Sequence, residues 1–135
     1  MKAFEPHYDS HGIPHYGKDH PYDGKEYKMQ EATGLIVQYV KSVTAIHVPN
    51  ERSAKTNKYT LFSLMRQGVR PGVSDWIFLT PSTAFIELKA KGGKLNDNQI
   101  AFLLEMKDKG FPIAVCWNLD AFEFLIKSHA NKNFK

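Results

Sequence analysis

Residues 74–89 read S-D-W-I-F-L-T-P-S-T-A-F-I-E-L-K, and this stretch decides the fold. Two apolar runs, W-I-F-L and A-F-I-E-L, lie on either side of the turn-forming residues T-P-S. Such a pattern predicts a hairpin of two antiparallel strands. Because side chains alternate along a strand, Glu87 and Lys89 are expected on one face of the second strand, and Ile86 and Leu88 on the other.

The acidic residues of this hairpin can converge. Asp75 begins the first strand, so its carboxylate can lie beside that of Glu87. Two carboxylates supply hard oxygen ligands, which suit Mg²⁺ or Mn²⁺. A lysine beside such a metal, here Lys89, can orient or deprotonate an attacking water or stabilise charge on a phosphate. The spacing D-x11-E-x-K therefore indicates metal-assisted hydrolysis, with an exposed Glu–Lys pair at a sheet edge as the alternative.

Further helices and strands are expected around the hairpin. From residue 26 to about 41, apolar residues recur at helical spacing and predict one buried stripe, formed by Met29, Ala32, Leu35, Ile36, Tyr39, Val40 and Val43. The pattern also predicts strands at 43–48 and 113–117, and helices at 59–67, from Asn96 to about 109, and after Asn118. This order predicts an α/β fold with a central mixed β-sheet flanked by helices.

Composition excludes several classes of protein. The 135 residues suit one globular domain, and the single cysteine excludes an internal disulfide framework and a cysteine-based zinc site. Neither a membrane helix nor a signal peptide is expected, because no apolar run is long enough. The 18 lysines and arginines exceed the 14 acidic residues, which favours a polyanionic partner such as nucleic acid.

Residues 1–24 differ from the rest of the chain. They hold three prolines, three glycines and four of the six histidines, with few aliphatic residues, so we expect a flexible arm or surface wrap before a domain at residues 25–135. His7, His11 and His15 recur every four residues, a spacing that would align imidazoles for a metal on a helix. Because glycine and proline interrupt that helix, a solvated tail is the favoured interpretation.

Several motifs together suggest a family. The runs H-V-P-N-E (47–51), G-V-R-P-G-V-S-D-W (68–76), F-I-E-L-K (85–89), G-K-L-N-D-N-Q (93–99) and K-G-F-P-I-A-V-C (109–116) resemble the VRR-NUC branch of the PD-(D/E)XK nuclease superfamily. The resemblance covers about residues 26–127. It implies a restriction-endonuclease-like core and Mg²⁺- or Mn²⁺-dependent hydrolysis of DNA phosphodiester bonds, often in branched DNA. Ser74 departs from the superfamily's name-giving motif, which has proline before the aspartate.

The resemblance also implies roles for individual residues. Asp75, Glu87 and the backbone carbonyl of Leu88 would bind the metal, and Lys89 would be the catalytic lysine. The family has a first-helix glutamate followed four residues later by glutamine, which matches Glu26; Glu31 is the competing acid, because helical geometry does not separate the two.

Gln99 is predicted on the buried face of its helix, near Phe102, Leu103 and Met106. An unpaired amide there would cost about 1 to 3 kcal/mol, so Gln99 should have a hydrogen-bond partner. The resemblance implies that it faces the scissile phosphate or metal-bound water, and a buried network with the backbone is the alternative.

Residues that would contact DNA lie between the first two motifs. The resemblance places the H-x-P-N-E residues beside the site, and the basic residues near them are candidate phosphate contacts. These candidates are His47, Asn50, Glu51, Arg52, Lys55, Lys58, Arg66 and Arg70.

We therefore expect a metal-dependent DNA endonuclease, similar to small stand-alone phage and bacterial members of the family. The expected partner is branched DNA, the protein could be a homodimer, and the expected location is the cytoplasm of a bacterial or phage-infected cell. Two alternatives remain, namely a nuclease of ordinary duplex or single-stranded DNA without junction preference, and a non-catalytic DNA-binding accessory protein.

Overall fold

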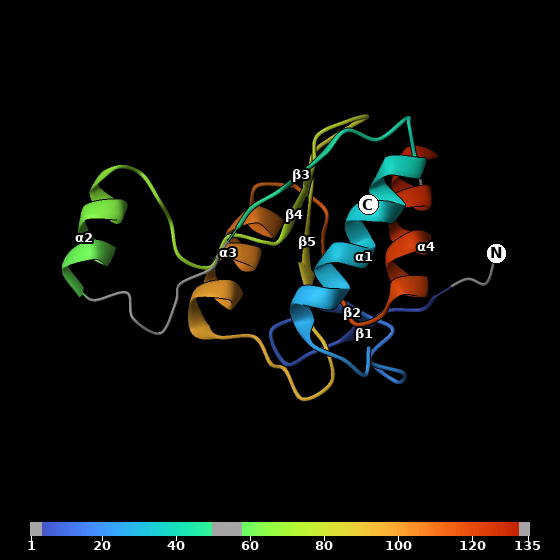
Figure 1. The fold of residues 1–135 in the computed structure, drawn as a ribbon, viewed down its shortest axis with the longest axis horizontal. Helices are drawn as coiled ribbons and strands as arrows, with labels where there is room; N and C mark the ends of the chain where they lie inside the picture. Colours follow the sequence, from blue (N-terminus) through green and yellow to red (C-terminus); the bar gives the residue numbers. More distant parts are fainter. Residues whose placement is uncertain (1–3, 50–57, 133–135) are drawn as a thin grey trace.

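The computed structural model describes residues 4–49 and 58–132, which form one mixed sheet with helices on both faces (Figure 1). The strands are β1 (His7–Tyr8), β2 (Pro14–Tyr16), β3 (Ala45–His47), β4 (Trp76–Phe78), β5 (Ala84–Leu88) and β6 (Ile113–Cys116). The helices are α1 (Glu26–Tyr39), α2 (Lys58–Arg66), α3 (Asp97–Asp108) and α4 (Leu119–Ala130). Within the described ranges, no helix is long and apolar enough to cross a membrane.

The sheet has the order β1-β2-β6-β5-β4-β3. β6 pairs in parallel with both β2 and β5, and the other neighbouring strands are antiparallel. Helices α1 and α4 cover one face and α3 covers the other (Figure 1). The predicted α/β class, a mixed sheet flanked by helices, is confirmed.

The hairpin of β4 and β5 forms as predicted, with Trp76 opposite Ile86. Ile86 and Leu88 are fully buried in the core below α1 and α4, where they pack with Phe122. Phe85 points to the opposite face and contacts residues of α3. The predicted alternation along β5 is therefore present, and both faces of this strand are covered.

Local hydrogen bonds explain where α3 and α4 begin. The Asn96 side chain accepts a hydrogen bond from the backbone N–H of Gln99 (2.9 Å), and the Asn118 side chain accepts one from that of Ala121 (2.7 Å). Both are N-cap interactions, which satisfy amide groups that have no partner within the helix. The two predicted caps are confirmed.

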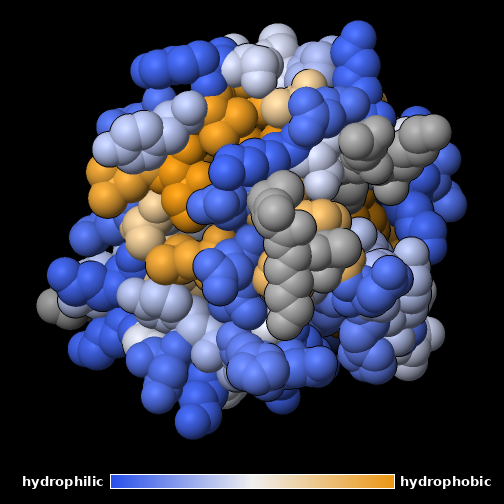
Figure 2. All heavy atoms as spheres, turned by 90° about the vertical axis from the view of Figure 1, so that its right-hand side faces the viewer, coloured by the Kyte–Doolittle hydropathy of each residue, from blue (hydrophilic) through white to orange (hydrophobic). Residues whose placement is uncertain are grey.

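The buried stripe of α1 differs from the prediction. Leu35 is 59% exposed and Tyr39 is 85% exposed, whereas Thr33 is fully buried. The indole N–H of Trp76 donates a hydrogen bond to the Thr33 hydroxyl (2.9 Å), and this contact turns the Thr33 side of the helix toward the sheet. Figure 2 shows apolar side chains at the surface on the side of the molecule where α1 and α4 lie.

The N-terminal residues, expected as a flexible arm or surface wrap, contribute two short strands. β1 and β2 extend the sheet beyond β6, and Ile13 is fully buried against α3 and β6. His7, His11 and His15 lie on strands and a turn instead of one helix face, so the possible row of imidazoles does not form.

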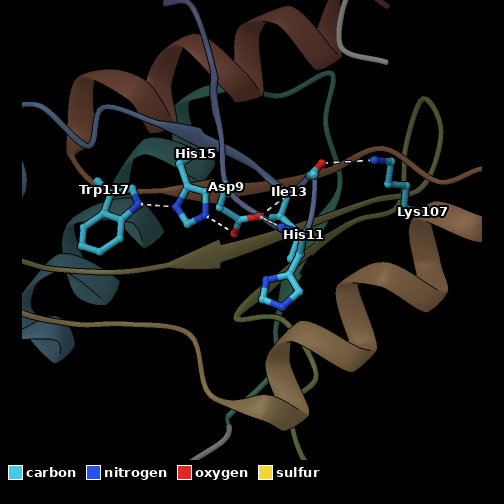
Figure 3. A network of polar contacts seen from close by, with 7 residues as sticks. Asp9, His11, Ile13, His15, Lys107 and Trp117 are labelled. Atoms are coloured by element: carbon cyan, nitrogen blue, oxygen red, sulfur yellow. Dashed lines mark hydrogen bonds and ion pairs between the residues drawn. The ribbon is translucent and has the colours of Figure 1, made fainter.

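A polar network attaches these strands to the end of β6 (Figure 3). The indole N–H of Trp117 donates to His15 Nδ1 (2.9 Å), so the other ring nitrogen carries the proton and donates to the Asp9 carboxylate (2.8 Å). The second Asp9 oxygen accepts hydrogen bonds from the backbone of His11 and Ile13. Buried His15 therefore has both nitrogens paired, and burial lowers its pKa.

Candidate active site

The hairpin brings together the two acids that the sequence predicts. Asp75 directly precedes β4 and Glu87 lies near the end of β5, so the antiparallel pairing places them side by side. The Asp75 carboxylate accepts a hydrogen bond from the backbone N–H of Leu88 (2.8 Å), which fixes its direction. The role of the Leu88 carbonyl as a metal ligand stays a prediction.

Helix α1 adds a third acid at its first residue. Carboxylate oxygens of Glu26, Asp75 and Glu87 all lie within 4.8 Å of one another, in the one such group of possible metal ligands found among residues 4–49 and 58–132. Glu31 is not part of this group, and its carboxylate lies 3.9 Å from Lys28 Nζ at the surface. The structure thus brings Glu26, and not Glu31, to the two hairpin acids.

Two further predicted residues contact Glu87. Lys89, only 6% exposed, has its Nζ 3.8 Å from Glu87 Oε1, and the Gln99 side-chain amide donates a hydrogen bond of 2.9 Å to the same oxygen. Gln99 therefore has the hydrogen-bond partner that the sequence requires, and this partner is Glu87. Gln99 does not lie in the middle of a buried helix face, however. It is half-buried in the first turn of α3, where its side-chain oxygen accepts from the backbone N–H of Asn96 (3.0 Å).

The electrostatics of the three acids fit a cation. Burial and the neighbouring Asp75 raise the pKa of Glu87 well above its usual value. Burial likewise raises the pKa of Asp75, and desolvation raises that of Glu26. Glu87 Oε2 is buried without a hydrogen-bond partner in the described part of the chain. A divalent cation would supply the missing partner, and carboxylate oxygens are the ligands that Mg²⁺ and Mn²⁺ prefer.

These side chains open onto a cleft of about 430 Å³. Its lining residues come from α1, β3, the hairpin and α3, and are Glu26, Tyr27, Gln30, Glu31, His47, Asp75, Glu87 and Gln99. Tyr27 was not predicted from the sequence, because one exposed tyrosine beside a glutamate carries no pattern. The cleft is open and most of its lining residues are polar or charged, unlike the enclosed apolar pockets that bind small ligands.

Of the described residues predicted to contact DNA, only His47 lines the cleft. Its Nδ1 is 3.0 Å from the backbone carbonyl oxygen of Asp75. Arg70 forms an ion pair with Glu105 (3.0 Å) and lies over the ring of Phe102, so its guanidinium is held against α3. Arg66, at the end of α2, is exposed.

The other predicted DNA contacts are not tested by the structure. Asn50, Glu51, Arg52 and Lys55 lie outside the described residues, and Lys58 is the first residue of α2.

Comparison with protein families gives one match. The model of the VRR-NUC domain matches residues 24–117, more than half of the chain, and this range contains all three clustered acids, Lys89 and Gln99. Comparisons with curated proteins and with solved structures give no significant match. The mixed sheet with flanking helices is consistent with the restriction-endonuclease-like core predicted from the motifs. The chain belongs to the VRR-NUC family, a family of nuclease domains in the PD-(D/E)XK superfamily.

Proposed function

We propose that the protein is a metal-dependent DNA endonuclease that hydrolyses phosphodiester bonds with Mg²⁺ or Mn²⁺. The observation that carries this proposal is the group of carboxylates of Glu26, Asp75 and Glu87 within 4.8 Å, at the side of an open cleft. The three carboxylates repel one another when ionised; Lys89 offsets part of this repulsion, and a cation between them would offset more.

The acids would hold the cation together with the Leu88 carbonyl. When bound, a divalent cation lowers the pKa of a water ligand and polarises the phosphoryl oxygens. Asp75 is fixed for this role by the Leu88 N–H, and Glu87 by the Gln99 amide. The two hairpin acids are therefore each oriented by a second group, as metal-binding carboxylates usually are.

Lys89 and Gln99 would act on the reacting groups. The Lys89 side chain lies on the Glu87 side of β5. As an ammonium it can orient the attacking water and offset negative charge on the phosphate in the transition state, whereas accepting the proton of that water would require the neutral amine. Gln99 keeps Glu87 in position and faces the same cleft, so it can also donate to a phosphate oxygen or to the attacking water.

We further propose branched DNA as the preferred substrate and a homodimer as the active form. Small nucleases that cut symmetric junctions often use two sites related by a twofold axis. The basic net charge and the open cleft support a nucleic-acid substrate, and the nuclease family supports DNA. A nuclease without junction preference is the alternative that the substrate comparison below tests.

The test is cleavage of four substrates, namely a labelled four-way junction, a flap, a linear duplex and a single strand, with Mg²⁺, Mn²⁺ or EDTA. We expect cleavage with either metal, fastest on the branched forms, and none in EDTA. Lys89→Ala and Glu87→Ala should each lower the rate at least about 100-fold. Lys91→Ala removes the same charge at an exposed position two residues away and should cut like the wild type.

Two results would contradict the proposal in different ways. Equal rates on all four substrates would remove the junction preference and leave a general nuclease. DNA binding without cleavage of any substrate, unchanged by either site variant, would leave the accessory DNA-binding role.

A further inference from the structure

Helix α2 stands apart from the sheet and its covering helices (Figure 1). Large apolar side chains on this helix are therefore exposed: Phe62 is 59% exposed and Met65 is 45% exposed. Soluble proteins expose single apolar residues often, but an aromatic and a methionine on one isolated helix require an explanation.

The segment that contains α2 connects β3 to β4, and both of its ends lie at the active site. His47, the last residue of β3, and Asp75, before β4, both line the cleft, and α2 lies on the chain between them. Hydrogen bonds hold the two ends of this segment together. The His47 ring and the backbone N–H of Val48 both donate to the carbonyl oxygen of Asp75 (3.0 and 2.8 Å). The segment that carries α2 is therefore anchored at both ends beside the acids of the cleft.

The charge of this stretch indicates the class of partner. Residues 52–70 contain five lysines and arginines and no acidic residue, so the other 116 residues carry 13 basic against 14 acidic side chains. The whole basic excess of the protein thus lies in the stretch that contains α2. Arg70 is paired with Glu105, but Arg66 is exposed on α2. A stretch with this excess of positive charge would repel a second copy of itself and attract a polyanion.

The described surface of α2 combines apolar contact with positive charge. Phe62, Met65 and Arg66 are spaced i, i+3 and i+4, so they share one face of the helix. The helix end is well defined, because the backbone N–H of Val69 bonds to the carbonyl of Leu64 (3.0 Å) and Gly68 adopts a φ of +97°. This exposed face can stack on a base while the arginine reaches a phosphate.

We propose that the face formed by Phe62, Met65 and Arg66 contacts unstacked bases at the branch point of DNA and gives the nuclease its preference for branched substrates. A continuous duplex hides the flat faces of its bases, whereas a junction or flap exposes them. Apolar side chains stack on or wedge between exposed bases. This inference rests on the proposed nuclease function, since branched DNA is the substrate that function names.

The test compares a four-way junction with a linear duplex of the same length, by binding in Ca²⁺ and by cleavage in Mg²⁺. Phe62→Ala should weaken binding and cleavage of the junction about tenfold, because base stacking is lost, and those of the duplex less than about twofold. Arg66→Ala should weaken both forms alike and lower the salt dependence by about one unit. Tyr39→Ala, which removes an aromatic ring that is 85% exposed on α1, should behave like the wild type.

The variants should fold, because the substituted side chains are exposed, and thermal melting checks this. The inference is overturned if the wild type has no junction preference, or if Phe62→Ala keeps the wild-type ratio of junction to duplex. It is also overturned if Phe62→Ala changes the oligomeric state in sedimentation, because the face would then hold another protein chain. If the wild type cleaves nothing, the nuclease proposal fails, and the binding ratio in Ca²⁺ still decides the role of α2.

Discussion

Replacing Glu87 by glutamine should stabilise the metal-free protein while abolishing its activity. Glu87 is 1% exposed, and one of its oxygens has no hydrogen-bond partner among the described residues. In Glu87→Gln the side-chain oxygen can keep the bond from Gln99. The new amide N–H can donate to the Asp75 carboxylate, so an unpaired acceptor becomes a paired donor.

The magnitude follows from three terms. Because their carboxylate oxygens lie within 4.8 Å of each other, ionised Asp75 and Glu87 repel by at least about 3.5 kcal/mol at an effective dielectric constant of about 20. Lys89, 3.8 Å from Glu87, attracts it by a similar amount, so these two terms nearly cancel. The cost of burying the Glu87 carboxylate then decides the sign, and an unsatisfied buried polar group costs about 1 to 3 kcal/mol.

The effect should depend on pH in a defined direction. The pKa of Glu87 in the folded protein is raised above the ordinary value of 4.5, so the unfolded chain loses this proton first as the pH rises. The wild type therefore loses stability relative to Glu87→Gln above about pH 4.5, and the difference is largest at alkaline pH.

The assay is thermal unfolding in EDTA at pH 8 and at pH 4.5. We expect Glu87→Gln to raise the Tm at pH 8 by about 4 to 12 °C, which corresponds to about 1 to 3 kcal/mol in a chain of this size. The control is Glu31→Gln, which removes an exposed acid of the same cleft and should change stability by less than about 0.5 kcal/mol. A variant that is no more stable than the wild type at pH 8 would refute the reasoning.

Three other predictions concern Lys89, Gln99 and His15. Lys89→Met should lower cleavage at least about 100-fold. The rise in Tm on adding Mg²⁺ should remain, and its loss would show that Lys89 supports metal binding instead of chemistry. Gln99→Ala and Asn96→Ala should each cost about 0.5 to 2 kcal/mol, because both break the cap of α3. Only Gln99→Ala should also reduce cleavage, and equal activity in both would assign Gln99 a structural role. His15 has a lowered pKa in the folded protein, so the unfolded chain binds its proton first and stability should fall as the pH drops below about 6.5. Melting of the wild type and His15→Gln at pH 7.5 and 5.5 should show a smaller loss in the variant; an equal loss would place the pH dependence elsewhere.

Most elements around the active site could be predicted from the sequence, because their signals are local. The hairpin is marked by two apolar runs and a turn, and the helices α3 and α4 by Asn96 and Asn118 at their N-caps. The proximity of Asp75 and Glu87 follows from hairpin geometry alone. Helical spacing treats Glu26 and Glu31 alike, so the sequence favours Glu26 only through the motif of the family it resembles, and the packing of α1 against the sheet brings Glu26 to the other acids.

The N-terminal strands could not be predicted, because their stability comes from distant residues. β1 and β2 have two and three residues and no apolar alternation. His15 is buried by pairing with Trp117, which is 102 residues away in the sequence. The exposure of Leu35 and Tyr39 has a similar cause, because the bond between Trp76 and Thr33 sets the rotation of α1.

β2 lies outside the residues that match the family but inside the folded sheet. The family match begins at residue 24, yet the backbone N–H of Trp117 bonds to the carbonyl of Tyr16 (2.9 Å). A chain shortened to the matched residues would leave β6 with an unpaired edge, and such edges promote aggregation. For this protein, a soluble preparation of the catalytic unit should therefore include the strands that precede the similarity, as well as α4 that follows it.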